Sequence, residues 1–229
     1  MVKFKFMLSK DEDINIWLDF IEEPKTYGKD WLKSYPDSFK ASLKGKSKKE
    51  QKDIVIRYIE KYYTKEYIDR FYNNKEKLRK HKDKIVKVLE KIHNRKFPVK
   101  NIIFKYNTFI ACPYQWDEKN KDWFGIFLSK KYINKGAIGV AIHELMHLFF
   151  HYYFWDILKN KKLNYNDKHF IKESFTVIVN EEFKDILDHK DYGYDDHRKL
   201  RKCILNEWKK GKSFEEIAKY VFSNFKTLK

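Results

Sequence analysis

The residues 137–150 constrain the fold of this chain more than any other stretch. They read Ala-Ile-Gly-Val-Ala-Ile-His-Glu-Leu-Met-His-Leu-Phe-Phe, and their only ionisable side chains are His143, Glu144 and His147. A helix that is apolar on all sides is buried inside a protein. Buried polar side chains must pair with one another or bind a metal ion. The sequence therefore predicts a buried helix within the run 137–154. Its three polar residues are expected either to pair with one another or to bind a metal ion.

The spacing of these three residues indicates a metal site. On a helix, His143 and His147 lie one turn apart on the same face, so their imidazoles can converge on one zinc ion. Glu144 is rotated by about 100° from His143, so it borders the metal rather than binding it. That is the place for a general base that acts on a zinc-bound water. The alternative is a core helix whose histidines hydrogen-bond to the backbone or to Glu144.

A third ligand must come from the chain after His147, because a catalytic zinc ion usually has three protein ligands. We predict Glu173, since the segment 170–179 reads as a second, nearly apolar helix with one acid near its start. A buried carboxylate needs a cation, so removing Glu173 should stabilise the metal-free protein. Glu181 is the rival, but its polar surroundings are typical of a solvated helix end. His151 is expected in a supporting or surface position.

His-Glu-x-x-His on one helix, with a glutamate on a following helix, resembles the gluzincin group of zinc metallopeptidases. The resemblance covers residues 125–188, under a third of the chain. It implies a zincin-like catalytic part, zinc held by His143, His147 and Glu173, and hydrolysis of peptide bonds. Glu144 would take a proton from the zinc-bound water and pass it to the leaving amine.

Two further resemblances leave alternatives open. The stretch 180–185 reads Asn-Glu-Glu-Phe-Lys-Asp and is similar in its letters to the thermolysin-type motif, which keeps Glu181 as a candidate ligand. The motif followed by His151 is similar to bacterial regulatory proteases that cleave repressors, although that family usually has glycine where Met146 stands. The alternatives to a general metallopeptidase are therefore a regulatory or nucleic-acid-associated protease and a non-catalytic zinc-binding protein.

Two more segments carry expected roles in such a site. Zinc peptidases often use a histidine or tyrosine after the ligand helix to stabilise the oxyanion, and Tyr192, Tyr194 and His197 follow the predicted Glu173 helix. The segment 123–129 reads as a strand that could align an extended substrate by strand pairing. The alternatives are structural roles for the three side chains and an internal position for the strand.

The whole chain predicts an α+β fold with a helical N-terminal part, a small antiparallel sheet and a helical catalytic part. Expected strands are 2–8, 101–111 and 123–129, the last two forming a hairpin around a polar turn at 117–122. Expected helices outside the site are 11–23, 48–63, 65–73, 75–95, 198–209 and one opened by a capping box at Ser213. The expected division is a lobe over 1–98 and a catalytic lobe over 99–229, unless both form one compact domain.

The net charge of +17 favours acidic partners, but lysines that solvate helix faces explain it equally in a lysine-rich composition. We favour the second explanation, so the expected partner is a peptide or protein substrate rather than nucleic acid or a membrane. Cys112 and Cys203 have no metal or redox spacing and are expected to be ordinary thiols. No signal sequence or bilayer-spanning run is recognisable, so a cytoplasmic protein is expected.

Overall fold

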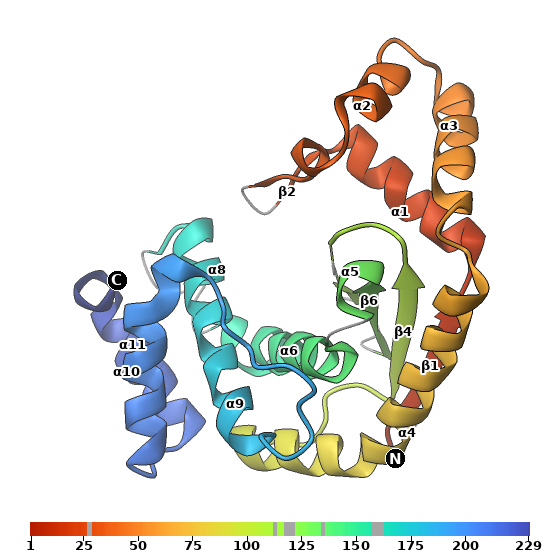
Figure 1. Ribbon diagram of the computed structural model, residues 1–229. Helices are drawn as coiled ribbons and strands as arrows, with labels where there is room; N and C mark the ends of the chain where they lie inside the picture. Colours follow the sequence, from red (N-terminus) through yellow and green to blue (C-terminus); the bar gives the residue numbers. More distant parts are fainter. Residues whose placement is uncertain (27–28, 112–113, 117–121, 134–135, 157–162) are drawn as a thin grey trace.

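The computed structural model describes residues 1–26, 29–111, 114–116, 122–133, 136–156 and 163–229. The fold is α+β, as predicted, with helices packed around one small sheet (Figure 1). The four strands of this sheet are β1 (Lys3–Leu8), β4 (Asn101–Asn107), β5 (Tyr114–Trp116) and β6 (Trp123–Ser129). A separate two-stranded ribbon consists of β2 (Lys25–Thr26) and β3 (Lys29–Asp30).

The sheet is mixed rather than antiparallel, so the predicted hairpin of 101–111 with 123–129 is wrong. The strand order is β1-β4-β6-β5, and β4 pairs with both β1 and β6 in parallel. Only β5 runs antiparallel to its neighbour, β6. The near-continuous apolar run Trp-Phe-Gly-Ile-Phe-Leu in β6 is typical of a parallel strand that is buried on both faces. The predicted polar turn at 117–122 lies, except for Asp122, outside the described residues.

The position of β6 also corrects its expected role at the sheet edge. It lies between β4 and β5, so its backbone groups pair on both sides. Among the described strands the outer positions belong to β1 and β5. The alternative prediction, that the segment 123–129 is an internal strand, is therefore confirmed.

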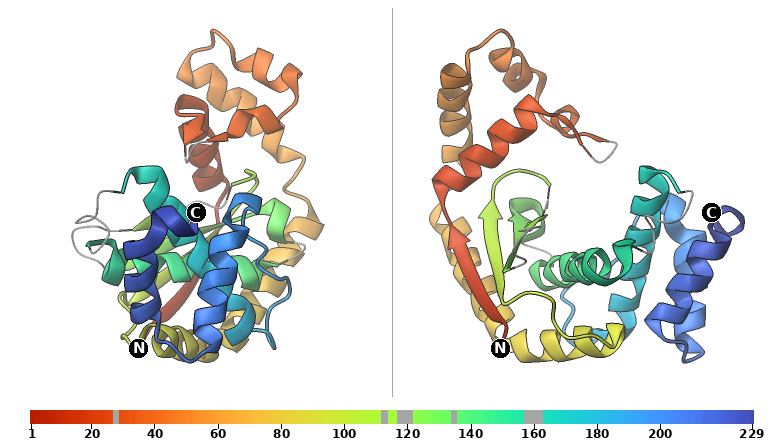
Figure 2. Two further views of the ribbon diagram at one scale, coloured as in Figure 1. Left: turned by 90° about the vertical axis from the view of Figure 1, so that its left-hand side faces the viewer. Right: turned by 180° about the vertical axis from the view of Figure 1, so that it is seen from behind.

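The N-terminal helices form a core of their own around Trp17. They are α1 (Lys10–Glu22), η1 (Trp31–Ser34), α2 (Asp37–Leu43) and α3 (Lys48–Glu60). Trp17 is fully buried against Tyr35, Phe39 and Phe109, and its indole nitrogen donates to Thr108 Oγ1 at 3.0 Å. In Figure 2 this group lies beyond one end of the sheet.

One long helix, α4 (Lys65–His93), replaces the two helices predicted over 65–73 and 75–95. The residue between them, Asn74, is neither glycine nor proline, and asparagine alone does not end a helix. The helix ends where Asn94 adopts a left-handed conformation with φ of 48°. Its apolar stripe packs against the central helix, α6 (Ala137–Phe149).

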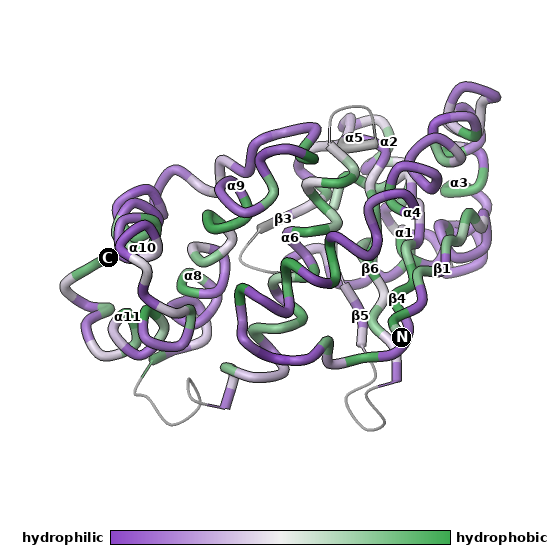
Figure 3. The backbone as a smooth tube through the Cα atoms, turned by 90° about the horizontal axis from the view of Figure 1, so that it is seen from below, coloured by the Kyte–Doolittle hydropathy of each residue, from purple (hydrophilic) through white to green (hydrophobic). Residues whose placement is uncertain are grey.

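One short helix precedes α6 in the chain, and the other remaining elements follow it. They are α5 (Lys130–Ile133), the π-helical segment η2 (Phe150–Phe154), α8 (Tyr165–Phe175), η3 (Thr176–Ile178), α9 (Val179–Glu182), η4 (Asp195–His197), α10 (Arg198–Lys209) and α11 (Phe214–Leu228). The predicted capping box of Ser213 with Glu216 is present at the start of α11. Figure 3 shows α6 as largely hydrophobic, whereas α10 is mostly hydrophilic.

The larger core joins α4, the sheet, α6 and the C-terminal helices, so residues on both sides of residue 98 contribute to it. The division into lobes at that residue stays a prediction. Over the described part of the chain, no helix is long and apolar enough to cross a membrane. Cys203 is a free thiol, and Cys112 lies outside the described residues.

Candidate metal centre

Helix α6 holds the motif at the floor of a cavity of about 940 Å³. The lining comes from η1, β5, α6, α8 and the segment 189–197. The start of α6 is fixed by Asp188, whose carboxylate accepts from the backbone nitrogens of Ile138 at 3.3 Å and Gly139 at 3.2 Å. A side chain at Gly139 would lie 3.0 Å from the carbonyl oxygen of His189, so this glycine lets the chain pack closely over the helix.

The predicted ligand residues come together. Glu173 lies on α8, and its Oε2 is 3.3 Å from His143 Nε2 while its Oε1 is 3.1 Å from His147 Nε2. One ligand atom from each of the three residues lies within 4.8 Å of the others. Ligand atoms in a tetrahedral zinc site, each about 2.0–2.1 Å from the metal, are separated by about 3.3 Å. Both the spacing and the two-histidine, one-carboxylate donor set fit zinc.

The rival carboxylate, Glu181, lies elsewhere. It belongs to α9, its side chain is about one-third exposed, and its Oε1 pairs with Lys209 at 3.2 Å. Glu173 is 6% exposed. The burial argument therefore selected the glutamate that meets the histidines, although metal binding itself stays a prediction.

Glu144 borders the ligand group without joining it. It lines the same cavity and is 7% exposed. Burial raises the pKa of Glu144 to about 7, against the opposing effect of His143. A carboxylate with a pKa near neutrality is suited to accept and return a proton.

A carboxylate that the sequence analysis missed orients His143. Asp191 Oδ2 lies 3.2 Å from His143 Nδ1, which leaves Nε2 directed toward Glu173. Metal-binding histidines usually donate their second ring nitrogen to such a carboxylate. Burial acts to raise the pKa of Asp191, but His143, Arg201 and Thr176 together outweigh burial and lower that pKa below its usual range. No motif marks Asp191 in the sequence, because its partner is 48 residues away.

Arg201 on α10 ties the Asp191 segment to the ligand helix. Its Nη1 donates to the Glu173 carbonyl at 3.2 Å and to Thr176 Oγ1 at 2.9 Å, and its Nη2 donates to the Asp191 carbonyl at 2.8 Å. Gly193 has a φ of +65°, and a Cβ there would lie 2.7 Å from the guanidinium. Only glycine fits both the backbone conformation and this close approach.

A buried lysine, which the sequence analysis also missed, contacts the same Glu173 oxygen that faces His147. Lys172 Nζ lies 3.2 Å from Glu173 Oε1 and donates to the Tyr114 hydroxyl at 3.1 Å. The Tyr114 hydroxyl also contacts His151 Nε2 at 2.5 Å. His151 belongs to the π-helical segment η2 and supports Tyr114 instead of joining the ligand group. Burial lowers the pKa of His151 to about 3, so its ring is neutral at physiological pH.

The three candidates for oxyanion stabilisation all line the cavity but differ in their surroundings. His197 is buried, and its ring lies 3.8 Å from that of Phe170. Tyr192 is 69% exposed and Tyr194 is 38% exposed. The structure thus brings them near the ligand group, and their chemical role stays a prediction.

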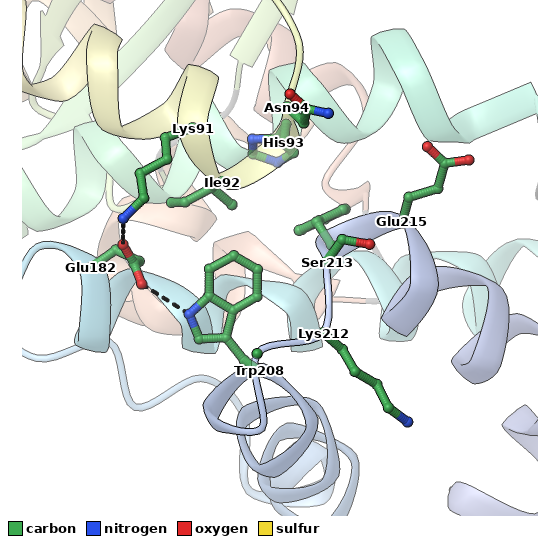
Figure 4. Close-up of a pocket in the computed structure, with 11 residues that line it drawn as sticks. Lys91, Ile92, His93, Asn94, Glu182, Trp208, Lys212, Ser213 and Glu215 are labelled. Carbon is green, nitrogen blue, oxygen red and sulfur yellow. Dashed lines mark hydrogen bonds and ion pairs between the residues drawn. The ribbon is translucent and has the colours of Figure 1, made fainter.

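A second, smaller pocket of about 350 Å³ lies between the end of α4 and the start of α11 (Figure 4). Trp208 donates to Glu182 Oε1 at 2.9 Å on one wall, and Lys91 pairs with the other carboxylate oxygen at 3.7 Å. None of the predicted site residues lines it, so the larger cavity is the candidate functional site.

Comparisons of this chain with protein-family models, with curated proteins and with solved structures found no match.

Proposed function

We propose that this protein is a zinc-dependent peptidase of the gluzincin type, with a zincin-like catalytic part. The observation that carries the proposal is the convergence of His143, His147 and Glu173 at ligand spacing, with Glu144 buried beside them. A zinc site with a purely structural role needs no adjacent carboxylate of raised pKa. Glu144 therefore favours hydrolysis over metal storage or structural zinc.

Each residue has a defined task in this reaction. Zinc, when bound by the two histidines and Glu173, supplies Lewis-acid polarisation of the scissile carbonyl and lowers the pKa of water. Glu144 accepts a proton from the attacking water and later donates it to the leaving amine nitrogen. Asp191 holds the His143 ring in the orientation that directs Nε2 toward the site.

The substrate we infer is an extended peptide segment. β5 is an outer strand of the described sheet, and its Tyr114 lines the cavity. An outer strand offers backbone groups that an extended chain can pair with. This assigns to β5 the aligning role that the sequence analysis gave to 123–129.

The test is metal content and proteolysis of the same preparations. Wild-type protein should bind one zinc ion per chain and cleave β-casein, an unstructured protein, with activity lost on chelation and restored by zinc. Glu144→Gln should keep the zinc and lower kcat by roughly 10²- to 10⁴-fold, because the amide cannot accept the proton. Glu181→Gln is the matched control and should retain wild-type activity.

Three results would contradict the proposal. Unchanged zinc content in both His143→Ala and His147→Ala would remove the metal site. Normal turnover in zinc-loaded Glu144→Gln would remove the base. One bound zinc ion without any cleavage of β-casein or of a mixed peptide library would favour the non-catalytic zinc-binding alternative.

A further inference from the structure

Lys172 is unusual because it buries a positive charge beside a predicted cation site. Its side chain is 3% exposed, and a lysine is almost never buried to this extent unless it is paired. Its pairing with Glu173 does not account for its presence in a zinc-loaded protein, because zinc would neutralise that carboxylate. A bound metal ion would also repel the nearby ammonium group. The residue therefore needs a further negative partner when the metal is present.

The buried charges around the site indicate what that partner is. Glu144, Glu173 and Asp191 supply three negative charges, and the positive charges are Lys172 and Arg201. Arg201 is committed to Asp191, which it approaches to 3.4 Å. With a zinc ion added, the site carries one positive charge in excess. When Glu144 takes the water proton, its negative charge moves to the substrate oxygen, and that oxygen becomes the new negative group near Lys172.

Tyr114 adds a neutral donor next to the ammonium group. Its ring comes from β5, and Lys172 donates to its hydroxyl oxygen at 3.1 Å. Since that oxygen already accepts from Lys172, the phenolic proton is directed to an acceptor, which is the neutral His151 in this structure. Lys172 and Tyr114 both line the cavity that holds the motif. Lys172 contacts the same Glu173 oxygen, Oε1, that faces His147, so these two donors lie directly beside the ligand group.

We propose that Lys172 and Tyr114 stabilise the negative oxygen of the tetrahedral intermediate, an assignment that rests on the proposed peptidase function. The water oxygen bonds to the carbonyl carbon, the π-electron pair moves onto the carbonyl oxygen, and Glu144 takes the water proton. The pair then returns, the C–N bond breaks, and the amine nitrogen takes the proton from Glu144. The two donors act on the charged oxygen between these steps.

This assignment differs from the one that the sequence predicts. His197 packs its ring on Phe170, and Tyr192 is largely exposed. Lys172, by contrast, touches the carboxylate of a predicted ligand. A terminal carboxylate of a substrate is the other anion that a lysine could bind, and the experiment distinguishes it by its effect on KM.

The experiment compares Lys172→Met and Tyr114→Phe with matched controls away from the cavity. Lys105→Met removes a partly buried lysine that pairs with Glu12, and Tyr153→Phe removes a hydroxyl that donates to the Lys96 carbonyl. Each zinc-loaded protein, freed of excess metal, is assayed for zinc affinity and for kcat and KM on a peptide containing the cleaved β-casein bond. Calorimetry then gives the Kd for inorganic phosphate and for the phosphinic analogue of that peptide.

We expect Lys172→Met to lower kcat by roughly 10²- to 10³-fold and Tyr114→Phe by at least about 10-fold. Both should weaken binding of phosphate and of the phosphinic peptide by similar factors, with KM, zinc affinity and both controls unchanged. Wild-type kcat and phosphinic-peptide affinity in the two variants would overturn the proposal. So would a variant that raises KM alone and only for peptides with a free carboxyl terminus, because that result indicates terminal carboxylate binding.

Two outcomes separate this inference from the proposed function. If Lys172→Met loses zinc, the Tyr114→Phe variant becomes the test of the oxyanion role. Unchanged kcat and unchanged phosphate affinity in Tyr114→Phe would overturn that role. If wild-type protein binds zinc and cleaves nothing, the proposed function fails. The phosphate affinities then show by themselves whether Lys172 and Tyr114 bind a negative oxygen. Equal phosphate affinities in all four variants would mean that they do not, which would overturn this inference as well.

Discussion

Two buried carboxylates in this molecule have opposite surroundings. Asp13 on α1 is fully buried and accepts from the Thr108 backbone nitrogen at 2.9 Å and from the Tyr63 hydroxyl at 2.9 Å. Glu173 on α8 is equally hidden, but its neighbours are His143, His147 and Lys172. Burial raises the pKa of Asp13. Burial also acts to raise the pKa of Glu173, but His147 and Lys172 outweigh it and hold that pKa well below its usual value.

The difference shows that burial of an acid does not by itself indicate a metal site. The lone pairs of Asp13 are satisfied by donors that belong to the fold, so its role is to join α1 to the end of β4. Glu173 faces two imidazole nitrogens, which are metal-binding groups in their neutral form. The chemistry of the donors around a buried carboxylate, and not its burial, separates a structural group from a candidate ligand.

The largest expected effect that tests this comparison is the loss of metal binding in Glu173→Ala. Removing one of three ligands should weaken zinc binding on the order of 10³-fold, measured by competition with a chelator. Glu181→Ala, whose carboxylate pairs only with Lys209 among the described contacts, is the control and should keep the wild-type affinity. A collapse of affinity in Glu181→Ala with a normal Glu173→Ala would move the ligand to the thermolysin-like stretch 180–185.

The Glu173→Ala variant also tests what Glu173 contributes to the stability of the metal-free protein. The sequence alone predicts that removing Glu173 stabilises the metal-free protein by relieving a buried charge. The structure reverses this expectation, because Lys172 would then be a buried ammonium without its carboxylate. Metal-free Glu173→Ala should therefore unfold at lower denaturant concentration than metal-free wild type. The sequence does not reveal this pair, since adjacent residues on a helix point in different directions.

Asp13→Ala should lower the stability of the protein without changing its zinc affinity. It leaves the Thr108 nitrogen and the Tyr63 hydroxyl buried without their acceptor, which should cost roughly 2–3 kcal/mol in the free energy of unfolding. Zinc affinity should not change. Urea unfolding and chelator competition on the same protein measure both quantities. A loss of zinc affinity without a loss of stability would contradict the structural role assigned to Asp13.

The sequence predicted the ligand group because its residues lie in periodic, nearly apolar segments. His143, His147 and Glu173 are each conspicuous as isolated polar positions in such helices. Asp191, Arg201 and Tyr114 were missed because they reach the site from a loop, a charged helix and a short strand, where polar residues are common. The parallel pairing of β4 with β6 was missed for a related reason: neighbouring strands in sequence favour a hairpin, and only the unbroken apolar run of β6 indicated otherwise.

Asp191→Asn tests the support behind His143 and should have a smaller effect than loss of a ligand. The amide keeps the size of the side chain but can present its nitrogen to His143 Nδ1, which weakens control of the ring orientation. Losses of 10- to 100-fold in metal affinity are typical for such partners. Chelator competition should show a decrease in that range. A decrease as large as that of Glu173→Ala would mean that Asp191 is itself a ligand.

The smallest expected effect concerns His93, a buried histidine that has no carboxylate partner among the residues that the structure describes. Its ring stacks on Phe149, its Nδ1 contacts the Leu89 carbonyl at 2.9 Å, and burial lowers its pKa to about 3 from an ordinary 6.5. The folded state therefore binds a proton at this ring less readily than the unfolded state. Stability from the neutral ring is complete above pH 6.5 and is lost as the pH falls toward 3.

Between pH 7 and pH 5.5 this linkage should lower the free energy of unfolding by roughly 1.2 kcal/mol, and His93→Phe should remove that part of the decrease. Urea unfolding of metal-free wild type and variant at both pH values measures the difference, because all other titrating groups are shared. Equal pH dependence in the two proteins would mean that His93 takes up a proton as readily in the folded state as in the unfolded state. A buried histidine would then tolerate a charge without a carboxylate, and the contrast between the surroundings of Asp13 and Glu173 would no longer distinguish a ligand site from a structural one.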